Sequence, residues 1–164
     1  MIRPRPRRPV PALALALASM LLTGTAEAGD RIVAAGAAVT EILWDIGVAD
    51  AVVGVDSTSK RPAEALATRP DVGYYRRLAP EGLLSLAPTL VIAVDGAGPR
   101  ETFETLAAAG VRIERLPEAR DAEGVRSMIE TIGRLVDRPA EARRLAEPSD
   151  AAIARRARER AATP

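Results

Sequence analysis

Four short apolar runs, each followed by a segment with helical periodicity, constrain the fold of this 164-residue chain most strongly. The runs are 31–35, 51–55, 90–94 and 111–116, and they consist mainly of Val, Ile, Leu and Ala. Runs of this kind are typical of strands that are buried on both faces of a sheet. Strands that alternate with helices along a chain form an α/β fold with a mainly parallel sheet.

The segments between the runs carry helical periods. Val39, Ile42, Leu43 and Ile46 recur at helical spacing, and Gly47 is placed to end that helix. Further helices are expected near 63–67, over 81–86 with Pro88 beyond its end, over 99–109 with Pro99 at the first helical position, and over 122–136. The last helix has an apolar stripe of Val125, Met128, Ile129, Ile132 and Leu135. We therefore expect a single Rossmann-like lobe, with a four-stranded sheet flanked by helices.

Residues 1–28 have the three parts of a secretory signal peptide. Arginines are the only charges before an apolar run at 10–22, and Ala26-Glu-Ala28 precedes Gly29. The apolar run is shorter than the roughly 20 residues that span a bilayer as a helix. We expect cleavage after Ala28, which gives a soluble periplasmic protein.

The composition changes at Pro139, where Ala and Arg begin to dominate. Apolar positions become sparse beyond this point, and Pro148 interrupts the helical pattern. We interpret residues 139–164 as a solvated helix that follows an α/β lobe of residues 29–138. No aromatic residues alternate with its arginines, so the segment does not indicate an RNA-binding tail.

Cysteine and histidine are both absent from the sequence. Their absence excludes disulfides, thiolate or imidazole metal ligands and Ser-His catalysis. An enzyme is also disfavoured because no cofactor-binding fingerprint is present. The formal charge of +1 at pH 7 is too small to attract a phosphate backbone, so we expect no nucleic-acid partner. We also expect the protein to be a monomer.

The loops that follow the predicted strands are the places to look for a ligand site. In open parallel sheets, ligands bind beyond the carboxyl ends of the strands. The loops expected there are 36–38, 56–60 and 95–98, and residues 71–79 can reach the same edge. The turn at Gly36 matches neither G-x-G-x-x-G nor a P-loop, so it indicates a tight strand-to-helix turn.

Three carboxylates, Glu118, Asp121 and Glu123, lie close together in the sequence. They stand at a predicted helix start, where acidic residues stabilise the positive end of the helix dipole. We therefore interpret them as helix-start residues and not as a metal site.

Tyr74 and Tyr75 are two of only four aromatic residues, and Arg76 and Arg77 follow them directly. One interpretation is a pair of surface tyrosines that cover a small core. The other is a ligand platform, because a neighbouring guanidinium favours the phenolate form of a tyrosine. Tyrosinate is a known axial ligand of haem iron, and arginine also pairs with carboxylates. In an extended loop, Tyr74 and Arg76 would share one face and Tyr75 would point the other way.

Three segments carry a resemblance to a known family. They are Val53-Gly-Val-Asp-Ser-Thr-Ser59, Pro70-Asp-Val-Gly-Tyr-Tyr-Arg-Arg-Leu78, and Glu81-Gly-Leu-Leu-Ser-Leu-Ala-Pro-Thr-Leu-Val-Ile-Ala93. Residues 31–136 resemble the periplasmic haem-binding proteins of bacterial haem-uptake ABC transporters. These proteins belong to a wider group that binds cobalamin, ferric siderophores or haem. The first two segments resemble the haem subgroup, whereas the third is shared by the whole group.

The resemblance implies roles for four residues. Tyr74 falls on the axial iron ligand of haem, and Arg76 falls on the arginine that supports its phenolate. Tyr75 stands where the family usually has an apolar residue beside the porphyrin, which implies a stacking role. Glu81 falls on the acidic residue that docks this lobe to an arginine pocket of the membrane permease.

The family has two α/β lobes joined by a long helix, and the ligand is clamped between them. This sequence supplies the first lobe and the start of the linking helix, so we expect the amino-terminal half of such a protein, with weak binding of haem. Two alternatives stay open. The lobe binds cobalamin or a ferric siderophore instead, or it docks to a permease without binding a ligand.

Overall fold

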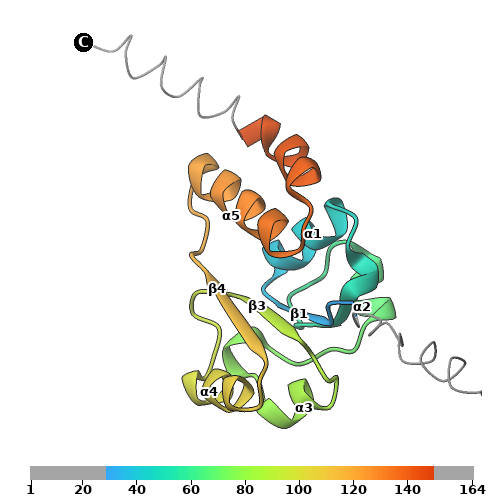
Figure 1. Ribbon diagram of the computed structural model, residues 1–164, viewed down its shortest axis with the longest axis vertical. Coiled ribbons are helices and arrows are strands. Elements are labelled where there is room, and N and C mark those ends of the chain that lie inside the picture. Colours follow the sequence, from blue (N-terminus) through green and yellow to red (C-terminus); the bar gives the residue numbers. More distant parts are fainter. Residues whose placement is uncertain (1–28, 150–164) are drawn as a thin grey trace, which may run out of the picture.

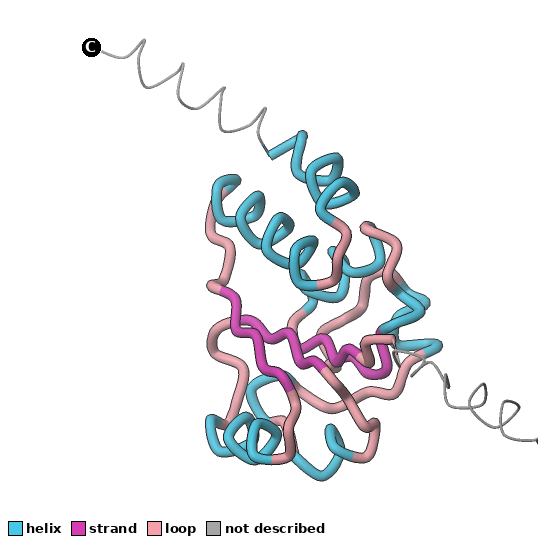
Figure 2. The backbone as a smooth tube through the Cα atoms, in the orientation of Figure 1, coloured by secondary structure: helices cyan, strands magenta, loops and turns pink. Residues whose placement is uncertain are grey.

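Four parallel strands form the central sheet of the lobe. The computed structural model describes residues 29–149. The strands are β1 (Ile32–Ala35), β2 (Val52–Val55), β3 (Leu90–Val94) and β4 (Arg112–Leu116). They pair in the order β2-β1-β3-β4, and all three pairings are parallel. The predicted four-stranded α/β lobe is therefore confirmed, and Figure 2 shows the strands as one layer between helices.

Helices follow the strands at the predicted places. They are α1 (Ala37–Asp45), α2 (Ala63–Thr68), α3 (Pro80–Leu84), α4 (Arg100–Ala108) and α5 (Ala122–Leu135), with 3₁₀ turns η1 (Ala49–Ala51) and η2 (Tyr75–Arg77). Gly47 follows α1 with φ of 78°, a left-handed conformation that suits glycine, and the predicted helix end is confirmed. None of the helices within residues 29–149 is long and apolar enough to cross a membrane.

The two faces of the sheet support two separate hydrophobic clusters. Alternate strand residues such as Ala34 and Ile92 pack with α1 and α5 on one face. Their neighbours, such as Val33 and Val91, pack with α3 and α4 on the other face. In Figure 1, α1 and α5 lie above the sheet and α3 and α4 lie below it. The three layers explain why β1 and β3 are buried along their whole length.

Four details of the sequence prediction are wrong. Pro99 is not the first helical residue, because its ψ of 164° is extended and α4 begins one residue later. Helix α3 ends at Leu84, two residues earlier than predicted. The edge strand β4 is only partly buried, since Arg112 and Arg115 are exposed. Val125, assigned to the buried stripe of α5, is 39% exposed because it lies on the outer side of that helix.

A helical segment that spans residues 139–149 packs against α5. Ala142 and Ala146 are buried in the core, which the sequence analysis missed. A β-carbon at Gly133 would lie 2.3 Å from Cβ of Ala142, so the two helices approach closely only because Gly133 lacks one. The helix runs through Pro148, contrary to prediction, and this residue is exposed. The predicted signal peptide, its cleavage site after Ala28, and residues 150–164 lie outside the described residues.

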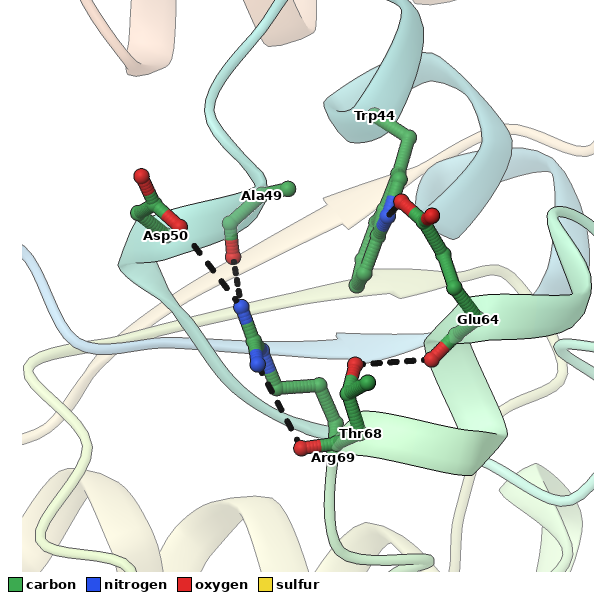
Figure 3. A network of polar contacts seen from close by, with 6 residues as sticks. All are labelled: Trp44, Ala49, Asp50, Glu64, Thr68 and Arg69. Atoms are coloured by element: carbon green, nitrogen blue, oxygen red, sulfur yellow. Dashed lines mark hydrogen bonds and ion pairs between the residues drawn. The ribbon is translucent and has the colours of Figure 1, made fainter.

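A polar network joins α2 to the end of α1 and to η1 (Figure 3). Trp44 Nε1 donates to Glu64 Oε1 at 2.5 Å, and the Arg69 guanidinium lies 5.8 Å from the centroid of a Trp44 ring. Arg69 also donates to the carbonyl of Ala49 at 3.0 Å and pairs with Asp50 at 3.9 Å. These contacts fix the short helix α2, which would be marginal as an isolated helix of six residues.

Candidate ligand-binding site

The carboxyl ends of all four strands open onto one depression of about 450 Å³. Its lining residues are Gly36, Ala37 and Ala38 after β1, Thr58 after β2, Val94 at the end of β3, Glu118 and Ala119 after β4, Met128 of α5, and the two tyrosines Tyr74 and Tyr75. The predicted loops 36–38 and 56–60 therefore contribute to the site. We call this hollow the ligand depression, and most of its surface is apolar.

Residues 70–78, which we call the tyrosine loop, are bonded to the same edge of the sheet. Val55 N donates to the carbonyl of Pro70 at 3.1 Å, and Val72 N donates to the carbonyl of Val55 at 2.9 Å. The loop thus adds a short parallel bridge beside β2. Gly98 N then donates to the carbonyl of Tyr75 at 2.9 Å, which ties the loop to residues 95–98 as well. The prediction that residues 71–79 reach the carboxyl edge is confirmed.

Tyr74 and Tyr75 form one wall of the ligand depression. Their ring centroids lie 5.0 Å apart, and the ring planes meet at 71°, an edge-to-face arrangement. Tyr74 is 43% exposed, whereas Tyr75 is half-buried and packs against both hydrophobic clusters. Both phenols therefore face the ligand depression. Tyr74 is accessible to solvent, and Tyr75 is held by its packing against the core.

Arg76 hydrogen-bonds to Tyr75, not to Tyr74. Its Nε donates to Tyr75 Oη at 2.9 Å, and its Cζ lies 5.2 Å from the centroid of the Tyr75 ring. The predicted geometry, with Tyr74 and Arg76 together and Tyr75 opposite, is wrong because η2 turns the chain where an extended loop was assumed. The hydrogen bond to Tyr75, with smaller contributions from the charges of Tyr75, Tyr74 and Glu118, raises the pKa of Arg76 above its ordinary value. Arg76 is thus a permanent cation within electrostatic reach of three residues that line the depression.

A buried carboxylate holds two of the lining loops together. Asp56 is fully buried, and its Oδ1 accepts from Gly36 N and from Ser59 Oγ, both at 2.9 Å. Its Oδ2 accepts from Thr58 N at 3.0 Å and from Thr58 Oγ1 at 2.6 Å. Ser59 Oγ also lies 2.7 Å from the hydroxyl of Thr40 on α1. The hydrogen bonds of buried Asp56 therefore hold Gly36 and Thr58, which line the depression, in fixed positions.

Glu118 and Met128 line the depression, although the sequence analysis gave neither of them a place there. Met128 is 5% exposed and packs in the core as expected, but it also faces this hollow. Asp121 is a helix-start residue as predicted, since its Oδ1 accepts from Gly124 N at 2.8 Å. The position of Glu118 two residues after the end of a strand was the signal that could have identified it.

Glu81 is exposed in the first turn of α3, as the sequence predicted. No ion pair within residues 29–149 includes its carboxylate. That part of the chain also contains no group of three or more acidic, histidine or cysteine side chains that could hold a metal ion.

A single parallel α/β lobe with an apolar hollow at its carboxyl edge has the form of a substrate-binding lobe. Residues 32–163 match the model of the family described as periplasmic binding protein, and the chain belongs to that family. The family consists of substrate-binding proteins of transport systems, which deliver their ligands to ABC permeases.

Among solved structures, this chain is similar to a periplasmic haem-binding protein of Roseiflexus sp. RS-1 in its apo form. The two share 38% identity with a TM-score of 0.71, over 77% of this chain and 48% of the other. A periplasmic haem-binding protein of Pseudomonas aeruginosa shares 35% identity with a TM-score of 0.71, over 78% of this chain and 46% of the other.

Among curated proteins, a vitamin B12-binding protein of Yersinia pseudotuberculosis is 31% identical over 105 residues. That match covers 64% of this chain and 37% of the relative. The chain therefore corresponds to well under half of the length of the curated relatives, and to less than half of the two haem-binding structures.

Proposed function

We propose that this protein captures haem in the periplasm and delivers it to an inner-membrane ABC permease, with Tyr74 as the axial ligand of the ferric iron. The observation that carries the proposal is the wall of the ligand depression. There an accessible phenol and a second phenol border a mostly apolar hollow, and an arginine cation is hydrogen-bonded to the second phenol.

Tyr74 is the better candidate for the iron ligand. The sequence contains no histidine or cysteine, which leaves phenol oxygens and thioethers as axial ligands of haem. Tyr75 already uses its hydroxyl to accept from Arg76, whereas no hydrogen bond from the rest of the described chain reaches the hydroxyl of Tyr74. Met128 is buried in the core, so its thioether is a poor alternative.

The surroundings of Tyr74 suit a flat, apolar ligand with anionic groups. Small side chains at Ala37, Ala38 and Ala119 leave room for a broad ring system. The Arg76 cation, hydrogen-bonded to the second tyrosine, can pair with a carboxylate of the ligand. Haem combines an apolar macrocycle, a ferric ion and two propionates.

Absorption titration tests the proposal. Ferric haem added to the wild-type protein should give the spectrum of a tyrosinate complex. Tyr74→Phe should lose this spectrum, whereas Arg77→Ala, a change at the neighbouring arginine, should keep it. The proposal fails if Tyr74→Phe binds haem as the wild type does.

Cobalamin is the second candidate ligand, and the vitamin B12-binding relative supports it. A ferric siderophore is a third within the same group. The same titration with cyanocobalamin and with a ferric siderophore separates these ligands. Saturable binding of either one, without binding of haem, would replace haem in the proposal.

Delivery to the permease would use Glu81, which is exposed and free of ion pairs within the described part of the chain. An ion pair that becomes desolvated at an interface contributes more than one at an open surface. Glu81→Ala should therefore weaken binding to a haem-type ABC permease in lipid vesicles several-fold. Glu101→Ala, at an exposed first-turn glutamate of α4, is the matched control. If the protein binds the permease but none of the three ligands, the alternative is supported in which the lobe docks to a permease without binding a ligand.

Export would depend on residues 1–28. Amino-terminal sequencing of the protein recovered from the periplasm should begin at Gly29. Recovery of residues 1–28 intact would contradict the proposed signal peptide.

A further inference from the structure

Arg76 is hydrogen-bonded at only one of its three nitrogens. Nε donates to Tyr75 Oη at 2.9 Å, and no other hydrogen bond or ion pair within residues 29–149 includes this guanidinium. A β-carbon at Gly96 would lie 3.8 Å from Cζ and Nη2, so the guanidinium rests against a residue without a side chain. Both terminal nitrogens, Nη1 and Nη2, thus keep their hydrogens available.

The hydroxyl that holds Arg76 is itself rigidly placed. Tyr75 packs against both hydrophobic clusters, and its carbonyl accepts from Gly98 N at 2.9 Å. Leu78 N donates in turn to the carbonyl of Gly98 at 2.8 Å. Two backbone hydrogen bonds therefore fix the tyrosine loop against residues 95–98 on either side of Arg76.

We propose that Tyr75 is a positioning residue, whose hydroxyl orients Arg76 so that Nη1 and Nη2 receive a carboxylate of the bound ligand. This inference rests on the proposed function and assigns Tyr75 a role other than iron ligation or stacking. A free arginine loses several rotamers when it binds an anion. An arginine held through Nε has lost part of that freedom before the ligand arrives, and the planar fork at its end matches a carboxylate.

The first test needs no ligand. In ¹⁵N-labelled protein, the Nε–H signal of Arg76 is the one that disappears in Arg76→Ala. We expect this signal to exchange with water at least tenfold faster in Tyr75→Phe than in the wild type. Arg77→Ala should leave it unchanged. Equal exchange in wild type and Tyr75→Phe would show that the hydroxyl does not hold Arg76, and would overturn the inference.

The second test is a double-mutant cycle read by titration with ferric haem. Tyr75→Phe keeps the ring and removes only the hydroxyl, so it should weaken binding about tenfold through Arg76. The double variant Tyr75→Phe/Arg76→Ala should bind as Arg76→Ala alone, because the hydroxyl has nothing left to position. Esterification of both haem propionates should reduce wild-type affinity and leave that of Arg76→Ala unchanged.

The outcomes separate this inference from the proposed function. Losses that multiply in the double variant, or a Tyr75→Phe variant that binds as the wild type does, overturn the positioning role while haem binding stands. A loss of the tyrosinate spectrum in Tyr75→Phe assigns iron ligation to Tyr75 and also overturns it. If the Nε–H signal of Arg76 is protected from exchange in the wild type but the protein binds no haem, the proposed function is wrong. The carboxylate role of Arg76 is then wrong as well.

Discussion

Replacement of Asp56 by alanine should destabilise the lobe by about 3–5 kcal/mol. The buried carboxylate accepts four hydrogen bonds, two from Thr58 and one each from Gly36 and Ser59. A net hydrogen bond to a charged group contributes roughly 1.5–3 kcal/mol, and a buried donor left unpaired costs about 1–3 kcal/mol. The four contributions do not add fully, because Ser59 keeps the hydroxyl of Thr40 and Thr58 is near enough to the surface to bind water. Gly36 is buried, and the loss of the acceptor of its amide accounts for much of the effect.

Urea denaturation, followed by the fluorescence of the single tryptophan, measures this loss. The midpoint should fall while the slope stays constant, since the variant still folds to the same compact state. Asp71→Ala is the matched control: that carboxylate is exposed and accepts one bond, from Gly73 N at 2.8 Å, so about 1 kcal/mol or less is expected. A loss below 1 kcal/mol for Asp56→Ala would refute the view that this carboxylate holds the two loops together.

Two further variants test the packing and the capping of α5 by urea denaturation. Gly133→Ala should destabilise the lobe by about 1–3 kcal/mol, because its new β-carbon would lie 2.3 Å from that of Ala142. Gly82→Ala, in open space on α3, should be neutral or stabilise by up to about 1 kcal/mol, and an equal loss in both variants would contradict close packing as the cause. Asp121→Ala removes the side-chain cap at Gly124 N and should cost about 1 kcal/mol, whereas Asp121→Asn should retain most of it. An unchanged midpoint for Asp121→Ala would show that this cap contributes nothing.

The sheet was predictable because burial on both faces leaves an unmistakable sequence pattern. Residues 32–35 and 90–94 are apolar at every position, and each pairs with neighbours on both sides. The carboxyl-edge location of the site followed from topology alone. Edge strand β4 was assigned too much burial, because its charged residues at 112, 114 and 115 reach solvent where no further strand pairs with it.

The wall of the site was predicted in its residues but not in its geometry. In an extended loop, side chains alternate between the two faces, so Tyr75 and Arg76 would point apart. The 3₁₀ turn over Tyr75–Arg77 instead brings them into hydrogen-bond contact. Such a turn depends on hydrogen bonds to residues 95–98, which are distant in sequence and leave no local pattern. Ala142 and Ala146 could not be recognised as core residues for the same reason, since their burial depends on α5, where Gly133 makes room for Ala142.

The short parallel bridge between Val55 and Asp71 has a consequence for how such a protein can change its ligand. The segment that presents the tyrosines is also the segment that pairs with Val55 at the end of β2, on the outer edge of the sheet. Shortening it, or exchanging it for a loop of different length, would uncover a strand edge able to pair with other chains. Substitution of side chains on an unaltered backbone leaves that pairing in place. The backbone of this loop therefore tolerates point mutation better than insertion or deletion.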